Sequence, residues 1–194
     1  MDTDQKTFLF KTLEKYTVVP DGEKEKLEKM VHVKNIGRNS FFVRQGDPQS
    51  DIAFILDGIF RVFCLDFSGN EKIMAFRTGG HFLCTYSPAI EKREVWYSIE
   101  ALADSRLLFI TRDDYKDLIM HHNCWDILIK NYIIQLYIEK EDRERSFLLD
   151  DAAERYRQFT GRYPGIEQHI PQYYIASYLG ISPVSLSRIR SRLK

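Results

Sequence analysis

The spacing of apolar residues changes twice along the chain. Near the start, Phe8, Leu9 and Leu13 lie at intervals typical of a helix, and Pro20 precedes a second, charged segment that also fits a helix. Proline suits the first position of a helix because its fixed φ angle matches helical geometry. We therefore expect two short helices before the pattern changes.

From about residue 35 to residue 111, short runs of β-branched and aromatic residues alternate with turn-forming residues, which is typical of strands. Glycines at positions 46, 58, 69 and 80 recur at intervals of 12, 11 and 11 residues. Short strands at this spacing predict an antiparallel β-roll of the jelly-roll or double-stranded β-helix type. Chance spacing of four glycines is the alternative. The expected strands are 41–43, 52–56, 59–65, 72–76 and 106–110.

Helical spacing returns between Arg112 and about Leu149, with apolar stripes on two opposite sides of one predicted helix. One stripe can pack on the β-roll, and the other has the 4-3-4 spacing of a coiled-coil seam. Asn131 lies in this seam, where a polar residue can fix the register of two helices. Burial within a monomer is the alternative, but too little sequence remains to cover both sides. We therefore expect a homodimer with a seam of Ile127, Asn131, Ile134 and Ile138.

The C-terminal segment predicts two short helices joined by a tight turn. Pro171 can begin the first helix and Gly180 can end it. Ser182 can then cap a second helix that has Pro183 at its first position. Two helices joined by a glycine-containing turn indicate a helix-turn-helix.

The second of these helices separates its residues by face. Leu186, Ile189 and Leu193 share one side, and the other side carries small, hydroxylated or arginine residues that suit the major groove of DNA. Arg188 can donate two hydrogen bonds to guanine. An amphipathic helix with a solvated basic face is the alternative. The expected DNA contacts are Gln172, Tyr173, Ser182, Val184, Ser185, Ser187, Arg188, Ser191 and Arg192.

Composition indicates an ordinary globular protein and excludes several other classes. The 194 residues are 44% hydrophobic and 29% charged with zero net charge, which excludes a disordered or polybasic protein. Positive charge is nevertheless concentrated at the end, because residues 182–194 hold four basic and no acidic side chains. The first residues are polar and no apolar run is long enough for a bilayer, so we expect a cytoplasmic protein with no membrane partner.

Candidate catalytic and metal-binding residues are sparse. Three widely spaced cysteines exclude a disulfide framework and a four-cysteine cluster. His121, His122 and Cys124 are close in sequence, but adjacent histidines point apart on a helix, and we expect no metal there. His81 fits a turn or core position better than a haem ligand. No hydrolase, P-loop or zinc-protease motif occurs, so we expect no enzyme.

These patterns predict an α+β protein in three parts. Residues 1–111 form a β-roll sensor domain, residues 112–148 a dimerisation helix, and residues 149–194 a helix-turn-helix domain. The chain resembles the Crp/Fnr family of bacterial transcription regulators, which share this order of parts. The resemblance depends on the segments Arg44 to Asp47, Ile52 to Val62 and Ile175 to Arg188.

The resemblance implies a homodimeric transcription regulator that binds double-stranded DNA at a near-palindromic site, with RNA polymerase as a further partner. Its β-roll implies a cyclic-nucleotide site, but the Gly-Glu and Arg-Ser pairs of cyclic-AMP binders are absent. The turn reads Gly80-His81-Phe82-Leu83, and Glu94 stands where an arginine must bind phosphate. We therefore do not expect cyclic AMP, and two alternatives remain: an unknown small-molecule effector, or a pocket that side chains fill and that has lost its ligand. The candidate effector residues are Phe82, Thr85, Tyr86, Arg93 and Trp96.

The chain departs from the Crp/Fnr pattern in two further respects, and two other functions are alternatives to DNA binding. The cysteine ligands of oxygen-sensing members are absent, so we expect no iron–sulfur cluster. Pro183-Val184 replaces the family's Arg-Glu pair, while Arg188 matches its later arginine, so the bases read should differ. A ligand sensor whose terminal helices dock on a protein is the main alternative function. A cupin-like enzyme would need inward-pointing histidines and carboxylates, for which the sequence has no pattern.

Overall fold

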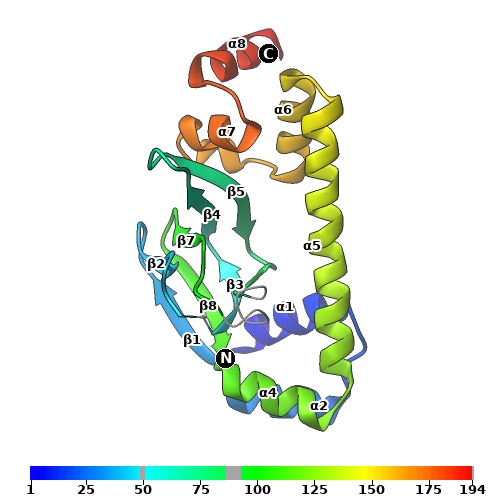
Figure 1. The fold of residues 1–194 in the computed structure, drawn as a ribbon. Coiled ribbons are helices and arrows are strands. Elements are labelled where there is room, and N and C mark those ends of the chain that lie inside the picture. Colours follow the sequence, from blue (N-terminus) through cyan, green and yellow to red (C-terminus); the bar gives the residue numbers. More distant parts are fainter. Residues whose placement is uncertain (49–50, 86–92, 194) are drawn as a thin grey trace. The chain divides into compact units, whose positions relative to one another are not determined.

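The computed structural model describes residues 1–48, 51–85 and 93–193 and has an α+β fold (Figure 1). It divides into two compact units, one of residues 1–62 with 76–135 and one of residues 63–75 with 136–194. The division crosses the long helix α5 (Cys124–Leu149) and a β-hairpin.

The chain forms two four-stranded sheets, with orders β1-β8-β3-β6 and β2-β7-β4-β5, and all of their strands except the outer parts of β4 and β5 belong to the first unit. Antiparallel pairs set the register, with Val33 and Phe54 both opposite Leu108. This is the β-roll that the glycine spacing predicts. The strands are β1 (His32–Ile36), β2 (Phe41–Val43), β3 (Ile52–Asp57), β4 (Ile59–Leu65), β5 (Glu71–Thr78), β6 (Phe82–Leu83), β7 (Ser98–Ala101) and β8 (Ser105–Ile110).

One apolar core fills the interior of the roll. Ile55, Phe60 and Leu107 have no exposed surface and pack together with Leu83 and Val95 from other parts of the roll. Side chains along a strand point alternately to opposite faces, so their neighbours in sequence face out of this core. The interior is therefore largely occupied by the protein's own side chains.

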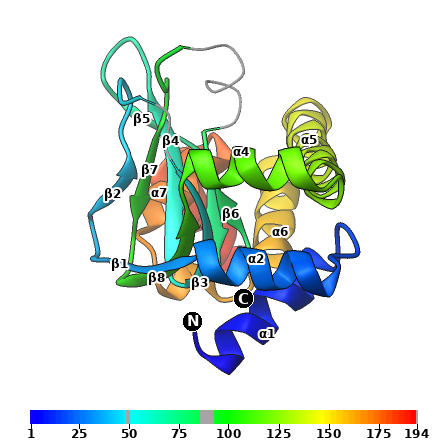
Figure 2. The ribbon, with the colours of Figure 1, turned by 90° about the horizontal axis from the view of Figure 1, so that it is seen from below.

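A second core joins the outer face of the first sheet to helices α1 (Thr3–Leu13), α2 (Asp21–Met30) and α4 (Arg112–His121). These helices gather on the side of the roll that β8 and β3 form (Figure 2). Phe54 and Leu108 provide the strand side of the core, and Leu9, Leu118 and Trp125 are among its helical members. Removing such side chains from water is the main source of stability for this arrangement.

The prediction of one uninterrupted helix from Arg112 to about Leu149 is wrong. The structure has two helices, α4 and α5 (Cys124–Leu149), with His122 in an extended conformation between them. The ring nitrogen Nδ1 of His122 accepts a hydrogen bond of 3.1 Å from the Cys124 N–H. This bond satisfies a backbone donor that would otherwise lack a partner at the start of α5.

The second unit contains the end of α5 and the C-terminal helices α6 (Ala152–Arg162), η1 (Ile166–Gln168), α7 (Gln172–Leu179) and α8 (Pro183–Leu193). Asp151 caps α6 by accepting the Glu154 N–H at 2.8 Å. Phe159, Ile175, Leu179 and Leu186 are buried between these helices. They form a small separate core around which the helix-turn-helix is built.

The outer part of the β4–β5 hairpin is attached to α7 within the same unit. Ser177 Oγ accepts the Ile73 N–H at 3.1 Å and donates to the Glu71 carbonyl at 3.2 Å. Arg143 on α5 donates to the Ile73 carbonyl at 3.2 Å. Three hydrogen bonds thus fix this hairpin edge to the helices, a contact that the sequence analysis did not predict.

Candidate nucleic-acid interface and ligand sites

The turn between α7 and α8 is held by its backbone and by one serine. Gly180 ends α7 with a left-handed φ of 68°, and the Ile181 N–H donates to the Ala176 carbonyl at 3.0 Å. Such an arrangement is common at helix ends because glycine adopts positive φ without steric cost. Ser182 Oγ accepts the Ser185 N–H at 3.1 Å and so caps α8. The roles that the sequence predicts for Gly180 and Ser182 are thus confirmed.

Helix α8 presents one polar face to solvent. Leu186 is fully buried and holds the opposite face against the domain. Leu193, which was expected to pack inward, is instead 43% exposed because it lies in the last turn of the helix. Of the nine predicted DNA contacts, eight are exposed and Ser185 is half-buried. They extend from Gln172 and Tyr173 at the start of α7 to Arg192 on α8.

The arginines of α8 differ in their exposure and in their partners within the domain. Arg190 Nη2 lies 3.5 Å from Glu167 Oε1, and Glu167 Oε2 accepts the Tyr156 hydroxyl at 2.8 Å. This network ties α8 to the rest of its own domain. Arg188 and Arg192, in contrast, are exposed to solvent.

The predicted seam of α5 is partly open to solvent. Ile127, Ile134 and Ile138 are each between 43% and 46% exposed. Asn131 is half-buried, and its side-chain amide donates to the Tyr16 carbonyl at 2.7 Å. That amide is thus anchored within its own chain. The exposed isoleucines form a row that a single copy of the chain leaves uncovered.

The predicted effector residues differ in how far they are exposed. Thr85 is buried, Arg93 is exposed, and Trp96 is 43% exposed with its ring edge-on to Tyr97. Phe82 packs on the helix side of β6 because its neighbour Leu83 occupies the interior of the roll. Tyr86 lies outside the described residues. Glu94, which the family resemblance aligns with a phosphate-binding arginine, is exposed.

A buried ion pair lies in the second sheet and was not found from sequence. Arg61 on β4 and Glu100 on the adjacent β7 expose only 4% and 10% of their side chains. Arg61 Nε donates to Glu100 Oε2 at 2.6 Å, and Nη2 approaches the same oxygen at 2.5 Å. A sequence pattern could mark either residue only as a charge in a strand, since their partnership depends on the pairing of strands.

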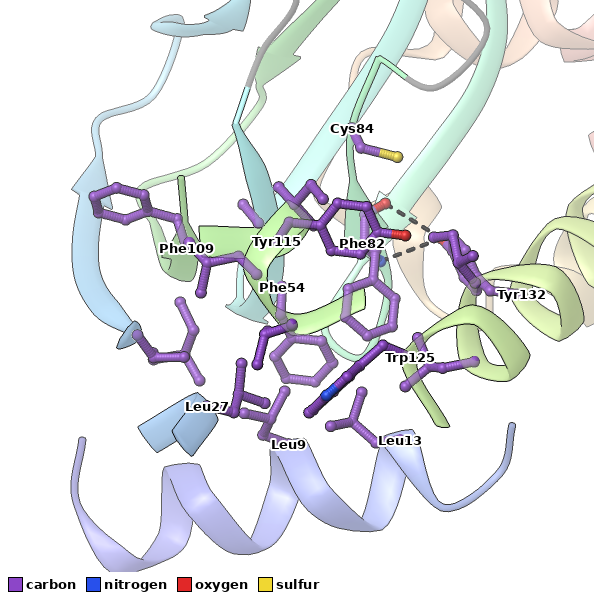
Figure 3. A pocket seen from close by; sticks show the side chains of 18 residues that line it. Leu9, Leu13, Leu27, Phe54, Phe82, Cys84, Phe109, Tyr115, Trp125 and Tyr132 are labelled. Carbon is purple, nitrogen blue, oxygen red and sulfur yellow. Dashed lines mark hydrogen bonds between the residues drawn. The ribbon is translucent and has the colours of Figure 1, made fainter. Parts of the chain in front are cut away.

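An apolar cavity of about 70 Å³ lies between the first sheet and the surrounding helices (Figure 3). Phe54, Phe82, Leu9 and Trp125 are among the residues that enclose it. The Tyr132 hydroxyl closes one side, because it accepts the Phe82 N–H and donates to the Phe82 carbonyl, both at 3.2 Å. Burial raises the pKa of Tyr132 and keeps this hydroxyl protonated. Among the described residues that line it, none is charged, and such a lining is unsuited to a phosphate.

Comparison with known proteins agrees with this geometry. Residues 33–122, from β1 to the end of α4, match the family model of the cyclic nucleotide-binding domain. Among curated proteins, none matches the chain. The resemblance to Crp/Fnr regulators is confirmed for the fold, which solved structures of that family share. None of the described helices combines the length and apolar character that crossing a bilayer requires.

Three solved structures illustrate the shared fold. A candidate Crp/Fnr-family transcriptional regulator from Eubacterium rectale is 15% identical, with a TM-score of 0.70 over 88% of this chain and 82% of that one. A candidate cyclic nucleotide binding protein from Ruegeria pomeroyi is 19% identical, with a TM-score of 0.67 over 100% and 88%. The catabolite activator protein of Thermus thermophilus is 20% identical, with a TM-score of 0.57 over 94% and 86%.

Proposed function

We propose that this chain is a DNA-binding transcription regulator that acts as a homodimer on a near-palindromic site. The observation that carries the proposal is the division of α8 into a buried face around Leu186 and an exposed face that includes Arg188. The fold shared with a Crp/Fnr-family regulator supports the same function. A role on DNA also fits the cytoplasmic location expected from the sequence, with RNA polymerase as a further partner.

The exposed face of α8 suits the major groove in shape and in chemistry. Ser187 and Ser191 are small enough to let the helix approach base edges, and their hydroxyls can bond to phosphates or bases. Arg188 can donate two hydrogen bonds to a guanine. Two copies of α8 in a symmetric dimer would enter successive grooves about one helical turn apart, which is why the site should be near-palindromic.

Homodimerisation would use the exposed row of Ile127, Ile134 and Ile138 on α5. An uncovered apolar row of this kind on a long helix is typical of a surface that packs against a second helix. The opposite side of α5 already has partners, because Trp125 and Tyr132 are buried in the first unit. The row therefore offers a surface for a second copy of the chain.

The β-roll would serve as the effector domain, with a degenerate cyclic-AMP site. Glu94 would repel a cyclic phosphate, and the interior of the roll is filled by residues such as Ile55 and Phe60. Any effector must bind one arrangement of the two DNA-binding domains better than another, since only differential affinity can shift that equilibrium. An effector of different chemistry is therefore favoured over cyclic AMP.

A sensor that docks on a protein through its terminal helices is the second candidate. Val184 and Tyr173 favour it, because they are 61% and 54% exposed and could contribute to an apolar interface. The two functions differ in their response to salt. Binding to phosphates releases counterions and weakens steeply as salt rises, whereas apolar docking does not.

A salt series on mixed-sequence DNA tests the proposal. Fluorescence anisotropy of a labelled duplex of about 30 base pairs would be titrated with the full chain between about 50 and 200 mM salt. The DNA function predicts that the dissociation constant increases by about tenfold or more over this range. Absence of binding at the lowest salt, or an affinity independent of salt, would favour the protein-docking function.

A further inference from the structure

A polar pocket of about 240 Å³ lies within the second unit, where the end of α5 meets α6 and α7. Among the described residues that line it, four are arginines and one, Asp142, is acidic. It is far more polar than the apolar cavity of the first unit. The arginines are Arg143, Arg145, Arg155 and Arg162.

Backbone carbonyls, not carboxylates, hold two of these arginines. Arg143 Nη2 donates to the carbonyls of Ile73 and Tyr178 at 3.2 and 3.0 Å. Arg155 donates to the Leu179 carbonyl from Nε at 3.2 Å and to the Asp150 carbonyl from Nη1 at 2.8 Å. A carbonyl orients a guanidinium without cancelling its charge, so both positive charges persist at the pocket.

Arg143 also has unused hydrogen-bonding capacity. Its guanidinium lies over the rings of Phe147 and Tyr178, with centroids 4.9 and 4.7 Å away. Its buried Nε has no hydrogen-bond partner in the part of the chain that the structure describes. Burial lowers the pKa of Arg143, which reflects the cost of keeping a cation away from water. A nearby anion would offset that cost.

The two arginines nearer the solvent share one carboxylate. Arg145 Nη2 lies 3.2 Å from one oxygen of Asp142, and Arg162 Nη2 lies 3.9 Å from the other. One negative charge thus faces two positive charges on this side of the pocket. The Asp150 carboxylate, which accepts a hydrogen bond from Gln158 at 2.8 Å, adds a second negative charge near Arg145 and Arg155. Four guanidiniums against these two carboxylates still leave an excess of positive charge.

We propose that this pocket binds a phosphate group. Guanidinium groups match phosphate oxygens in a two-pronged geometry, and arginine is the residue most often used where that geometry matters. The group could belong to a free phosphorylated metabolite or to the backbone of DNA. A site of this kind is separate from the β-roll, and the chain would then respond to an anion through its second unit.

The walls of the pocket connect it to the helix-turn-helix. Tyr178 and Leu179 belong to α7, and Phe147 touches Gly180 at the turn that follows. An occupied pocket would therefore bear directly on the position of α7. If the chain binds DNA as proposed above, ligand and DNA would influence each other's affinity by the same factor.

Inorganic pyrophosphate is the probe that tests the site. Isothermal titration of the full chain at constant ionic strength should show binding with a dissociation constant below about 1 mM. The variant R145A/R162A should weaken this binding by about tenfold or more, since both side chains reach solvent and lose only their shared bond to Asp142. R162K keeps the positive charge but loses the planar guanidinium group, so it should weaken pyrophosphate binding by less.

Two arginines outside the pocket provide matched controls. Arg157 lies on the same helix as Arg162 but pairs with Glu154, and Arg188 belongs to the exposed face of α8. R157A and R188A should each leave pyrophosphate affinity within about twofold of the parent chain. Equal weakening by these controls, or no binding tighter than about 10 mM, would overturn the proposal.

A competition arm distinguishes the two sources of the phosphate. A free metabolite predicts that pyrophosphate still binds when the protein is saturated with a duplex, and that R145A/R162A keeps its DNA affinity. The DNA backbone predicts that the duplex displaces pyrophosphate and that R145A/R162A binds DNA more weakly. These outcomes do not depend on which bases α8 reads, so the pocket can fail while DNA binding stands, or the reverse.

Discussion

Gly180 and Phe147 are so close that a Cβ atom on Gly180 would lie 2.7 Å from Cε1 of Phe147. Gly180 also has a φ of 68°, a conformation that residues with a Cβ rarely adopt. The turn of the helix-turn-helix therefore requires glycine for two independent reasons. One is the backbone, and the other is the aromatic ring that packs against it from α5.

Replacing Gly180 by alanine should lower the free energy of unfolding by about 1–3 kcal/mol, because it adds backbone strain and a steric clash. Thermal unfolding followed by circular dichroism measures the loss. Gly161 on α6 is the control, since its surroundings leave space for a Cβ and its φ is not positive. G161A should be neutral or stabilise the protein by up to about 1 kcal/mol. Equal effects of G180A and G161A on stability would disprove the claim that the turn requires glycine at position 180.

The apolar row on α5 predicts that a charge introduced into it will weaken the dimer. Ile134 is 46% exposed in the single chain and would be covered in the dimer. I134E should increase the dimer dissociation constant by about tenfold or more, because a carboxylate would be buried without a partner. Sedimentation velocity over a concentration series measures this change.

The neighbouring Gln135 supplies a matched control for the seam. It is exposed on a different face of α5, so Q135E adds the same charge away from the apolar row. The parent chain and Q135E should sediment alike. A monomeric parent chain, or equal dissociation of I134E and Q135E, would show that the row does not join two copies.

The buried pair of Arg61 and Glu100 should be costly to break on one side only. E100Q should lower the free energy of unfolding by about 3–5 kcal/mol, because it removes the carboxylate that pairs with a buried guanidinium. The double variant R61M/E100L removes both charges and should recover most of that loss. Urea denaturation of the three proteins measures the difference. A double variant no more stable than E100Q would contradict this account of the pair.

The loop between β4 and β5 predicts a dependence of stability on pH. Hydrogen bonds hold the pKa of Asp66 at about 2, first the Asn70 backbone N–H, then its side chain and the Ser68 N–H. A carboxylate with a lowered pKa stabilises the folded state above the ordinary pKa near 4, and that contribution disappears as the pH falls towards 2. The melting temperature of the parent chain should therefore decrease over this range.

D66N tests this dependence because it removes the titrating group. Its melting temperature should be lower at neutral pH and should fall less between about pH 4 and 2 than that of the parent chain. D126N removes one exposed carboxylate elsewhere, on α5, and should keep the full decrease. Parallel pH curves for D66N and the parent chain would refute the assignment.

Local signals in the sequence predicted local structure well. Gly180, Ser182 and Asp151 have the roles in turns and caps that their residue types suggest. The regular glycines predicted the strands of the β-roll because turn chemistry depends only on adjacent residues. The exposed face of α8 followed from helical periodicity in the same way.

Features that depend on distant partners could not be predicted from the sequence. Ser177 bonds to Glu71 and Ile73 across more than 100 residues, and Asn131 bonds to the carbonyl of Tyr16. The break before Cys124 also escaped detection, because neither proline nor glycine marks it. The arginine pocket could not be predicted either, since folding brings its residues together from α5, α6 and α7.

Selection of DNA from a random duplex pool by the purified chain, with no effector added, tests the central claim most directly. The account predicts an enriched near-palindrome whose half-sites lie about one helical turn apart. R188A should lose about 1–3 kcal/mol of affinity for that sequence and tolerate more substitutions at one position of each half-site. A pool without enrichment, or one enriched identically by R188A, would contradict the claim that α8 reads DNA.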